Sequence, residues 1–86
     1  MKRAVILGYQ YIDFQPDGKE RITGYKVFFA VDGGENVTGQ KSVSCWMNPA
    51  KFAEARLGVG EVRAVCFNEQ GKVEAFLPEE VLAYVA

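Results

Sequence analysis

The sequence predicts a small, mostly β domain of five strands, with one short helix between the third strand and the fourth. Five segments are rich in β-branched and aromatic residues, and turn-forming residues separate them. In most of these segments, apolar and polar residues alternate with a period of two, which is typical of a strand with one buried face. One segment instead opens on Asn48-Pro49, a helix start signal. We expect one domain over residues 1–86, with residues 78–86 as a C-terminal tail.

The first predicted strand covers residues 2–14 and is partly apolar on both faces. A strand of this kind either lies in the centre of a sheet or bends between two sheets. Gly8 offers the position for such a bend, because glycine tolerates a bulge. Simple alternation places Tyr9 and Tyr11 on one face with Val5 and Leu7. We therefore expect the two tyrosines to be core residues or contacts in a dimer.

Turns then separate the second and third strands. A proline-containing turn at residues 15–18 leads to the second strand, residues 21–31. A glycine-rich turn at residues 32–36 leads to the third strand, residues 37–47. In both strands the alternation predicts one apolar face and one more polar face that also carries an aromatic ring.

The helix and the last two strands follow. Asn48 is expected to cap the helix, whose body runs over residues 51–57 and ends at Gly58. The fourth strand covers residues 61–67, and a hairpin turn joins it to the fifth strand, residues 72–77. The tail after that strand is predicted to be either a helical turn or an extended arm.

Three strands, a helix and a two-strand hairpin occur in the same order in the oligonucleotide-binding barrel, or OB-fold. We expect this chain to form a small five-stranded barrel of that kind. A different small barrel, or a swapped dimer built from hairpins, is the alternative. The period of two predicts the residues inside the barrel, which are Val27, Phe29, Val43, Cys45, Val62, Ala64, Val73 and Ala75.

Composition and charge limit the chemistry that is expected. The chain has no histidine, the commonest general base near neutral pH, and we do not expect an enzyme or a cofactor. Cys45 and Cys66 are expected to be free thiols, and two cysteines without histidine do not make a zinc pattern. The net charge is −1, but residues 1–30 hold five cationic and three anionic residues. This asymmetry predicts a basic face on the first two strands.

The sequence also bears on location. No apolar run approaches the roughly 20 residues that span a bilayer. The positive start Met1-Lys2-Arg3 is followed by an apolar run, residues 4–7, that is too short for the core of a signal peptide. We therefore expect a cytoplasmic protein.

Three features resemble the single-stranded-DNA-binding proteins of filamentous bacteriophages. They are the long turn-forming segment from Gln15 to Arg21, the Gly24-Tyr25 step into the second strand, and the closing hairpin that ends on Phe76-Leu77-Pro78. The resemblance covers most of the chain as a pattern. It implies a homodimer that coats single strands of DNA during phage or plasmid replication.

The residues themselves also indicate binding to single strands. Such strands are held by cations along the phosphate backbone and by aromatic rings on which bases stack. The candidate site residues are Lys19, Arg21, Lys26, Phe28 and Trp46. Each has a structural alternative: Phe28 as core, Trp46 as the end of the barrel, and the cations as ordinary surface charge.

Two other roles remain open on the sequence. Exposed aromatic residues on a nearly neutral surface would also suit a protein partner. The acidic, apolar-ended tail, residues 79–86, is a second candidate for such contacts. A homodimer is expected because a chain of this size buries a limited share of its surface alone.

Overall fold

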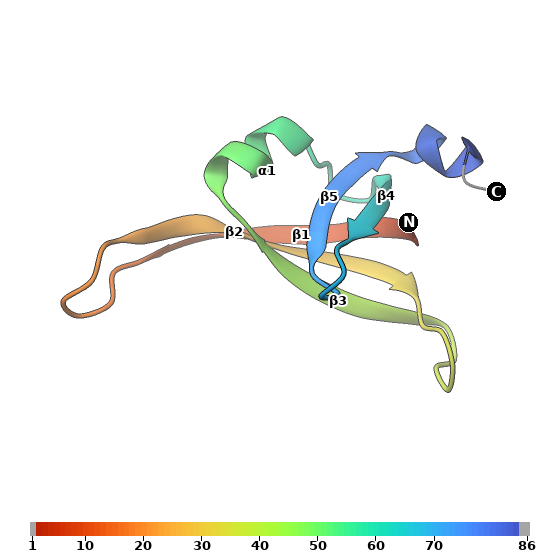
Figure 1. Ribbon diagram of the computed structural model, residues 1–86, viewed down its shortest axis with the longest axis horizontal. Coiled ribbons are helices and arrows are strands. Elements are labelled where there is room, and N and C mark those ends of the chain that lie inside the picture. Colours follow the sequence, from red (N-terminus) through yellow and green to blue (C-terminus); the bar gives the residue numbers. More distant parts are fainter. Residues whose placement is uncertain (1, 85–86) are drawn as a thin grey trace.

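The computed structural model describes residues 2–84 and shows a mostly β chain with one α-helix in that part (Figure 1). The elements are β1 (Lys2–Phe14), β2 (Ile22–Asp32), β3 (Gln40–Met47), α1 (Pro49–Ala55), β4 (Val62–Phe67), β5 (Val73–Pro78) and the 3-10 helix η1 (Glu79–Tyr84). The helix lies between the third and fourth strands, as the sequence predicts. The tail forms a helical turn through Tyr84, and Val85 and Ala86 lie outside the described residues.

The five strands form one antiparallel sheet in the order β3-β2-β1-β4-β5. β1 is the central strand. It pairs with β2 along most of its length, but with β4 only over Lys2–Val5. Because β3 and β5 are the outer strands of the order, the sheet is not closed. The five antiparallel strands are confirmed, whereas closure into a barrel stays a prediction.

The sheet nevertheless folds over onto itself, and the core lies between its two halves. The rings of Phe29 in β2 and Phe76 in β5 meet edge to face, with 5.3 Å between their centroids. Figure 1 shows β4 and β5 crossing the β1–β2–β3 half of the sheet. The buried core cluster consists of Ala4, Ile6, Val27, Phe29, Val31, Met47, Leu57, Val65 and Phe76.

A bulge in β1 changes which residues face the core. The register with β2 shifts between Ile6 and Gly8, so an extra residue is inserted near the predicted bend. Before the bulge, Ile6 pairs with Phe29; after it, Tyr9 pairs with Val27. Directly paired residues share a face of the sheet. The predicted grouping of Tyr9 with Leu7 is therefore wrong, because the bulge moves the tyrosines to the face of Ile6.

The predicted inner residues are correct in β2 and partly wrong in β4 and β5. Val27 and Phe29 are fully buried, and Val43, Cys45 and Val73 pack against the core. Ala64 is fully buried but lies outside the core cluster, and Val62 and Ala75 are half-buried and also outside it. The larger side chains of Val65 and Phe76 occupy the core in their place. In β4 the inner face carries Arg63, Val65 and Phe67, and the other face carries only apolar residues, so alternation pointed to the wrong face.

The helix begins as predicted and ends differently. The side chain of Asn48 accepts a 2.8 Å hydrogen bond from the backbone N–H of Lys51, and Pro49 opens the helix. The left-handed residue at the end is Arg56, with φ of 48°, and not Gly58. Arg63 in β4 donates a 2.9 Å hydrogen bond to the Arg56 carbonyl, which satisfies a free acceptor at the helix end.

A second set of contacts joins the end of the helix to β4. Glu61 accepts hydrogen bonds from the backbone N–H of Gly58 at 2.7 Å and from the Nε of Arg63 at 2.8 Å. Both donors favour the ionised carboxylate, the Gly58 amide first, and they lower the pKa of Glu61. The segment that follows the helix is thus joined to the start of β4 by one carboxylate and one guanidinium.

The far halves of β1 and β2 extend from the body as a long hairpin, at the left of Figure 1. Its turn is closed by a 3.1 Å hydrogen bond from the Lys19 N–H to the Pro16 carbonyl. The hairpin accounts for the elongated shape, 48 × 29 × 26 Å. Within residues 2–84, no helix is both long enough and apolar enough to cross a membrane.

Candidate nucleic-acid interface

Three of the five predicted site residues meet on the outer face of the sheet, the face turned away from the core. In the register of β2 and β3, Lys26 pairs with Trp46 and Phe28 pairs with Ser44. Residues 27 and 29 alternate with them and are fully buried, so residues 26 and 28 point to the other side. Lys26 is exposed, Phe28 is half-buried and Trp46 is 48% exposed. The predicted outer face of β2 and β3 is confirmed as a geometric arrangement.

Trp46 lies against the backbone of β2 at Gly24. A Cβ added at residue 24 would overlap the indole, with only 2.7 Å to Cε2. Glycine is required here because of this close approach and not because of an unusual backbone conformation. The indole therefore packs on the backbone of β2, and its exposed part faces outward. The alternative in which Trp46 only covers the end of a barrel does not account for this position.

Lys26 and Phe28 also contact each other. The Lys26 Nζ lies 5.8 Å from the centroid of the Phe28 ring, a cation–π distance. No carboxylate of the described chain comes within ion-pair distance of Lys26. The site therefore presents one cation that remains free for a phosphate, beside two aromatic rings.

Lys19 and Arg21 lie apart from these three residues, at the turn of the hairpin. Both are exposed. Arg21 donates two hydrogen bonds, from Nε and Nη2, to the two carboxylate oxygens of Asp13 in β1. This pairing lowers the pKa of Asp13 and raises the pKa of Arg21. The hairpin turn therefore offers Lys19 as its free cation and Arg21 as a cation that a carboxylate already neutralises.

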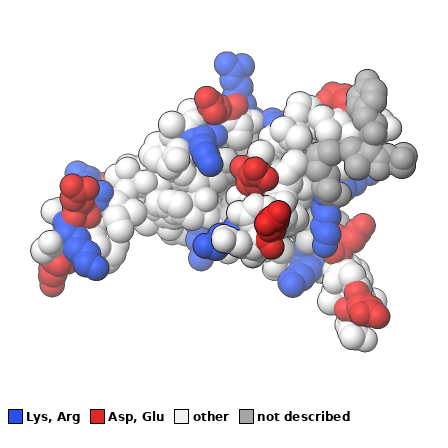
Figure 2. Space-filling model, viewed as in Figure 1, with Lys and Arg blue, Asp and Glu red and all other residues white. Residues whose placement is uncertain are grey.

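The basic face predicted for the first two strands is weakened by such pairs. Besides the Arg21–Asp13 pair, Arg3 lies 3.6 Å from Glu79 of η1. Figure 2 shows positive and negative groups interspersed on the face in view, and both signs at the end of the hairpin. Any contact with phosphates would therefore depend on few charges.

Sequence reasoning missed an aromatic cluster on the inner face, where the hairpin leaves the body. Tyr25 and Phe52 are stacked, with 3.8 Å between ring centroids and 7° between ring planes. Tyr9 meets Phe52 at 4.8 Å, and Tyr11 meets Tyr25 at 5.2 Å. Tyr9 is 45% exposed and Tyr11 is 54% exposed. The sequence signal that could have revealed this cluster was the β-bulge expected near Gly8. A bulge moves every later residue of β1 to the opposite face of the sheet.

Apolar side chains continue along the outer face of the hairpin. Gly24 pairs with Ile12, and Ile22 pairs with Phe14, so these residues share the face of Lys26. Phe14 is 56% exposed and Ile22 is 46% exposed. The hairpin therefore carries exposed apolar surface on both faces, whereas an ordinary solvated hairpin would be polar on at least one.

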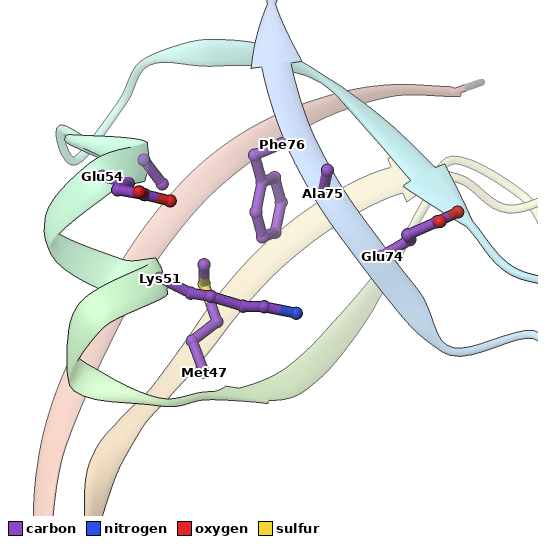
Figure 3. A pocket seen from close by; sticks show the side chains of 7 residues that line it. Met47, Lys51, Glu54, Glu74, Ala75 and Phe76 are labelled. Atoms are coloured by element: carbon purple, nitrogen blue, oxygen red, sulfur yellow. The ribbon is translucent and has the colours of Figure 1, made fainter.

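A cavity of about 300 Å³ lies where α1 meets the outer strands β3 and β5 (Figure 3). Met47 and Phe76 form apolar walls, and Lys51 extends from α1 toward β5. Glu54 and Glu74 supply two carboxylates to its lining. Met47 is buried and follows the exposed Trp46 in β3, so the cavity opens on the face of β3 opposite Trp46.

Both cysteines are free and half-buried. Burial raises the pKa of the Cys45 thiol to about 11, so the thiol is protonated at neutral pH and is a poor nucleophile. Among residues 2–84, no group of three or more His, Cys, Asp or Glu residues is placed to hold a metal ion. Comparison of the chain with protein-family models, characterised proteins and solved structures found no match.

Proposed function

We propose that this chain binds single-stranded DNA, without catalysis, on the outer face of β2 and β3. The observation that carries the proposal is the grouping of Lys26, Phe28 and Trp46 on one face of neighbouring strands. A free cation beside exposed aromatic rings is the combination that holds a phosphate and stacks its base. The resemblance to phage single-stranded-DNA-binding proteins supports the same function and adds a role in replication and a homodimer.

The proposed binding is broad in sequence and modest in strength. Every base has a face that stacks on an aromatic ring, so the site does not select bases. Each neutralised phosphate on a single strand contributes about −0.7 to the slope of log K against log salt. Among the five predicted site residues, Lys26 on the outer face and Lys19 at the hairpin turn have no carboxylate partner, which gives a slope of about −1.4 for a strand that reaches both.

Trp46 is the only tryptophan of the chain, so its emission reports on the site directly. We expect oligo(dT) to quench this emission at low salt, because a base stacks on the indole. Lys26→Ala is expected to weaken binding and to make the slope less negative by about 0.7. Lys41→Ala is the matched control, because Lys41 pairs with Val31 and thus lies on the opposite face of β3. Unchanged emission at saturating oligonucleotide would refute the proposal.

The exposed Phe14 and Ile22 favour a second candidate function, binding of a protein partner by the same face. Two results together would support that function instead. Single strands would not quench the Trp46 emission, and replacement of Trp46 would release a protein that the parent chain binds.

A further inference from the structure

The aromatic cluster on the inner face of the hairpin has no role in the site proposed above. It consists of Tyr9, Tyr11, Tyr25 and Phe52. The stacked pair of Tyr25 and Phe52 is half-buried and joins β2 to α1. Tyr9 contacts Phe52 and Tyr11 contacts Tyr25, and about half of the surface of each of the two tyrosines is exposed. Core aromatic residues are far less exposed, so filling the core does not account for the two tyrosines.

We infer that Tyr9 and Tyr11 form a second stacking surface for bases of the same single strand, on the face of the hairpin opposite Trp46. This inference rests on the proposed function. A stacked, half-buried pair holds the two exposed rings in fixed positions, which reduces the entropy lost when a base stacks on them. Tyrosine also suits a water-facing site, because its ring is apolar and its hydroxyl remains hydrated.

The charges around the cluster fit a nucleic acid. Asp13 follows Tyr11 by two residues and so lies on the same face of β1. Its carboxylate is bound at both oxygens by Arg21, so its negative charge is offset and repels a phosphate less. Lys19, at the turn of the hairpin, is a cation with no carboxylate within ion-pair distance in the described chain.

The edge of β1 gives the strand a route between the faces. β4 pairs with β1 over Lys2–Val5. The Ile6 N–H then donates a 2.9 Å hydrogen bond to the Glu61 carbonyl, and the Gly60 N–H donates a 2.7 Å hydrogen bond to the Ile6 carbonyl. From Leu7 onward, no described strand covers the edge of β1 that faces away from β2. A single strand that leaves Trp46 therefore crosses an open edge, beside the exposed Gln10, to reach Tyr9 and Tyr11.

The inference predicts that binding depends on the length of the oligonucleotide. A strand of about 4 nucleotides, the lower limit of site size for a single OB-type domain, occupies the outer face alone. A strand of about 16 nucleotides, near the upper limit, reaches both faces. Tyr11→Leu is expected to weaken binding of the long strand about five-fold or more, with no effect on the short strand. Tyr11→Phe, which retains the ring, is the matched control and is expected to bind both strands like the parent.

The test combines these titrations with photocrosslinking of the unmodified chain to oligonucleotides that carry bromouracil. Crosslinks to Tyr9 or Tyr11 that form only with the long strand support the second surface. If both lengths quench Trp46 but no crosslink forms and Tyr11→Leu has no effect, the second surface is refuted and the proposed function stands. If neither length binds, the proposed function itself fails. An equal loss at both lengths in Tyr11→Leu, without crosslinks, would assign the cluster to folding of the hairpin and refute the inference.

Discussion

Phe28 and Phe29 are neighbours in β2 that point to opposite faces, so replacing each with alanine separates stability from binding. Phe29 is fully buried and meets Phe76 edge to face. Removing a buried phenylalanine costs about 3–5 kcal/mol. A chain of this length has a total stability of about 4–13 kcal/mol, from 0.05–0.15 kcal/mol per residue. Phe29→Ala is therefore expected to remove a large share of the free energy of unfolding.

In a domain of this size, each kcal/mol shifts the melting temperature by about 4–8 °C. Phe29→Ala should thus lower the melting temperature by at least about 12 °C. Phe28 is half-buried on the outer face, and Phe28→Ala should cost about 1 kcal/mol while it weakens binding of oligo(dT).

The assay is thermal unfolding followed by circular dichroism, together with Trp46 quenching measured well below the transition. If Phe28→Ala unfolds the protein and Phe29→Ala leaves its stability unchanged, the register of β2 is shifted by one residue and the reasoning is wrong. If both variants have the expected stability but Phe28→Ala binds like the parent, the outer-face site is wrong while the fold stands.

Three further predictions concern the helix end, the cysteine and the glycine. Glu61 has a pKa lowered in the folded state, so its contribution to stability is present above its unfolded pKa and is lost as pH falls through the folded value. The difference in melting temperature between the parent and Glu61→Gln should therefore shrink between about pH 6 and about pH 3, and a constant difference would contradict this. Cys45, with a pKa of about 11, should be alkylated at about pH 9 more slowly in the folded chain than in the urea-unfolded chain, as followed by mass spectrometry of the labelled peptide. Gly24→Ala should displace the Trp46 indole and shift its emission maximum without loss of the β-type circular dichroism spectrum, and an unchanged maximum would show that the indole does not rest on β2.

The sequence predicted the five strands and the helix with boundaries within a few residues of those observed. The reason is local: Asn48-Pro49 and the turn at Gln15–Gly18 act on the backbone next to them. The alternation in β2 also predicted its buried face correctly, because Val27 and Phe29 are apolar and Lys26 is charged.

The errors arose where a distant residue or a change of register decides the structure. The bulge before Gly8 reverses the faces of β1, and its effect on Tyr9 appears only when β2 is aligned beside it. Arg56 takes the left-handed position at the helix end in place of Gly58, with support from Arg63, which lies seven residues further along the chain. The pairing of Arg21 with Asp13 likewise depends on the hairpin and reduces the charge of the predicted site.

The central position of β1 has a consequence for the order of folding. β1, β2 and β3 pair in sequence as two consecutive hairpins, and hairpins form within microseconds. The pairing of Lys2 with Val65, by contrast, joins residues far apart in the chain and must close a long loop at an entropic cost. During synthesis, the first three strands therefore emerge and pair while one edge of β1 is still unpaired, until β4 is made. The same edge remains unpaired beyond Ile6 after folding, so the outer part of this hairpin keeps backbone groups that no later strand of the sheet covers.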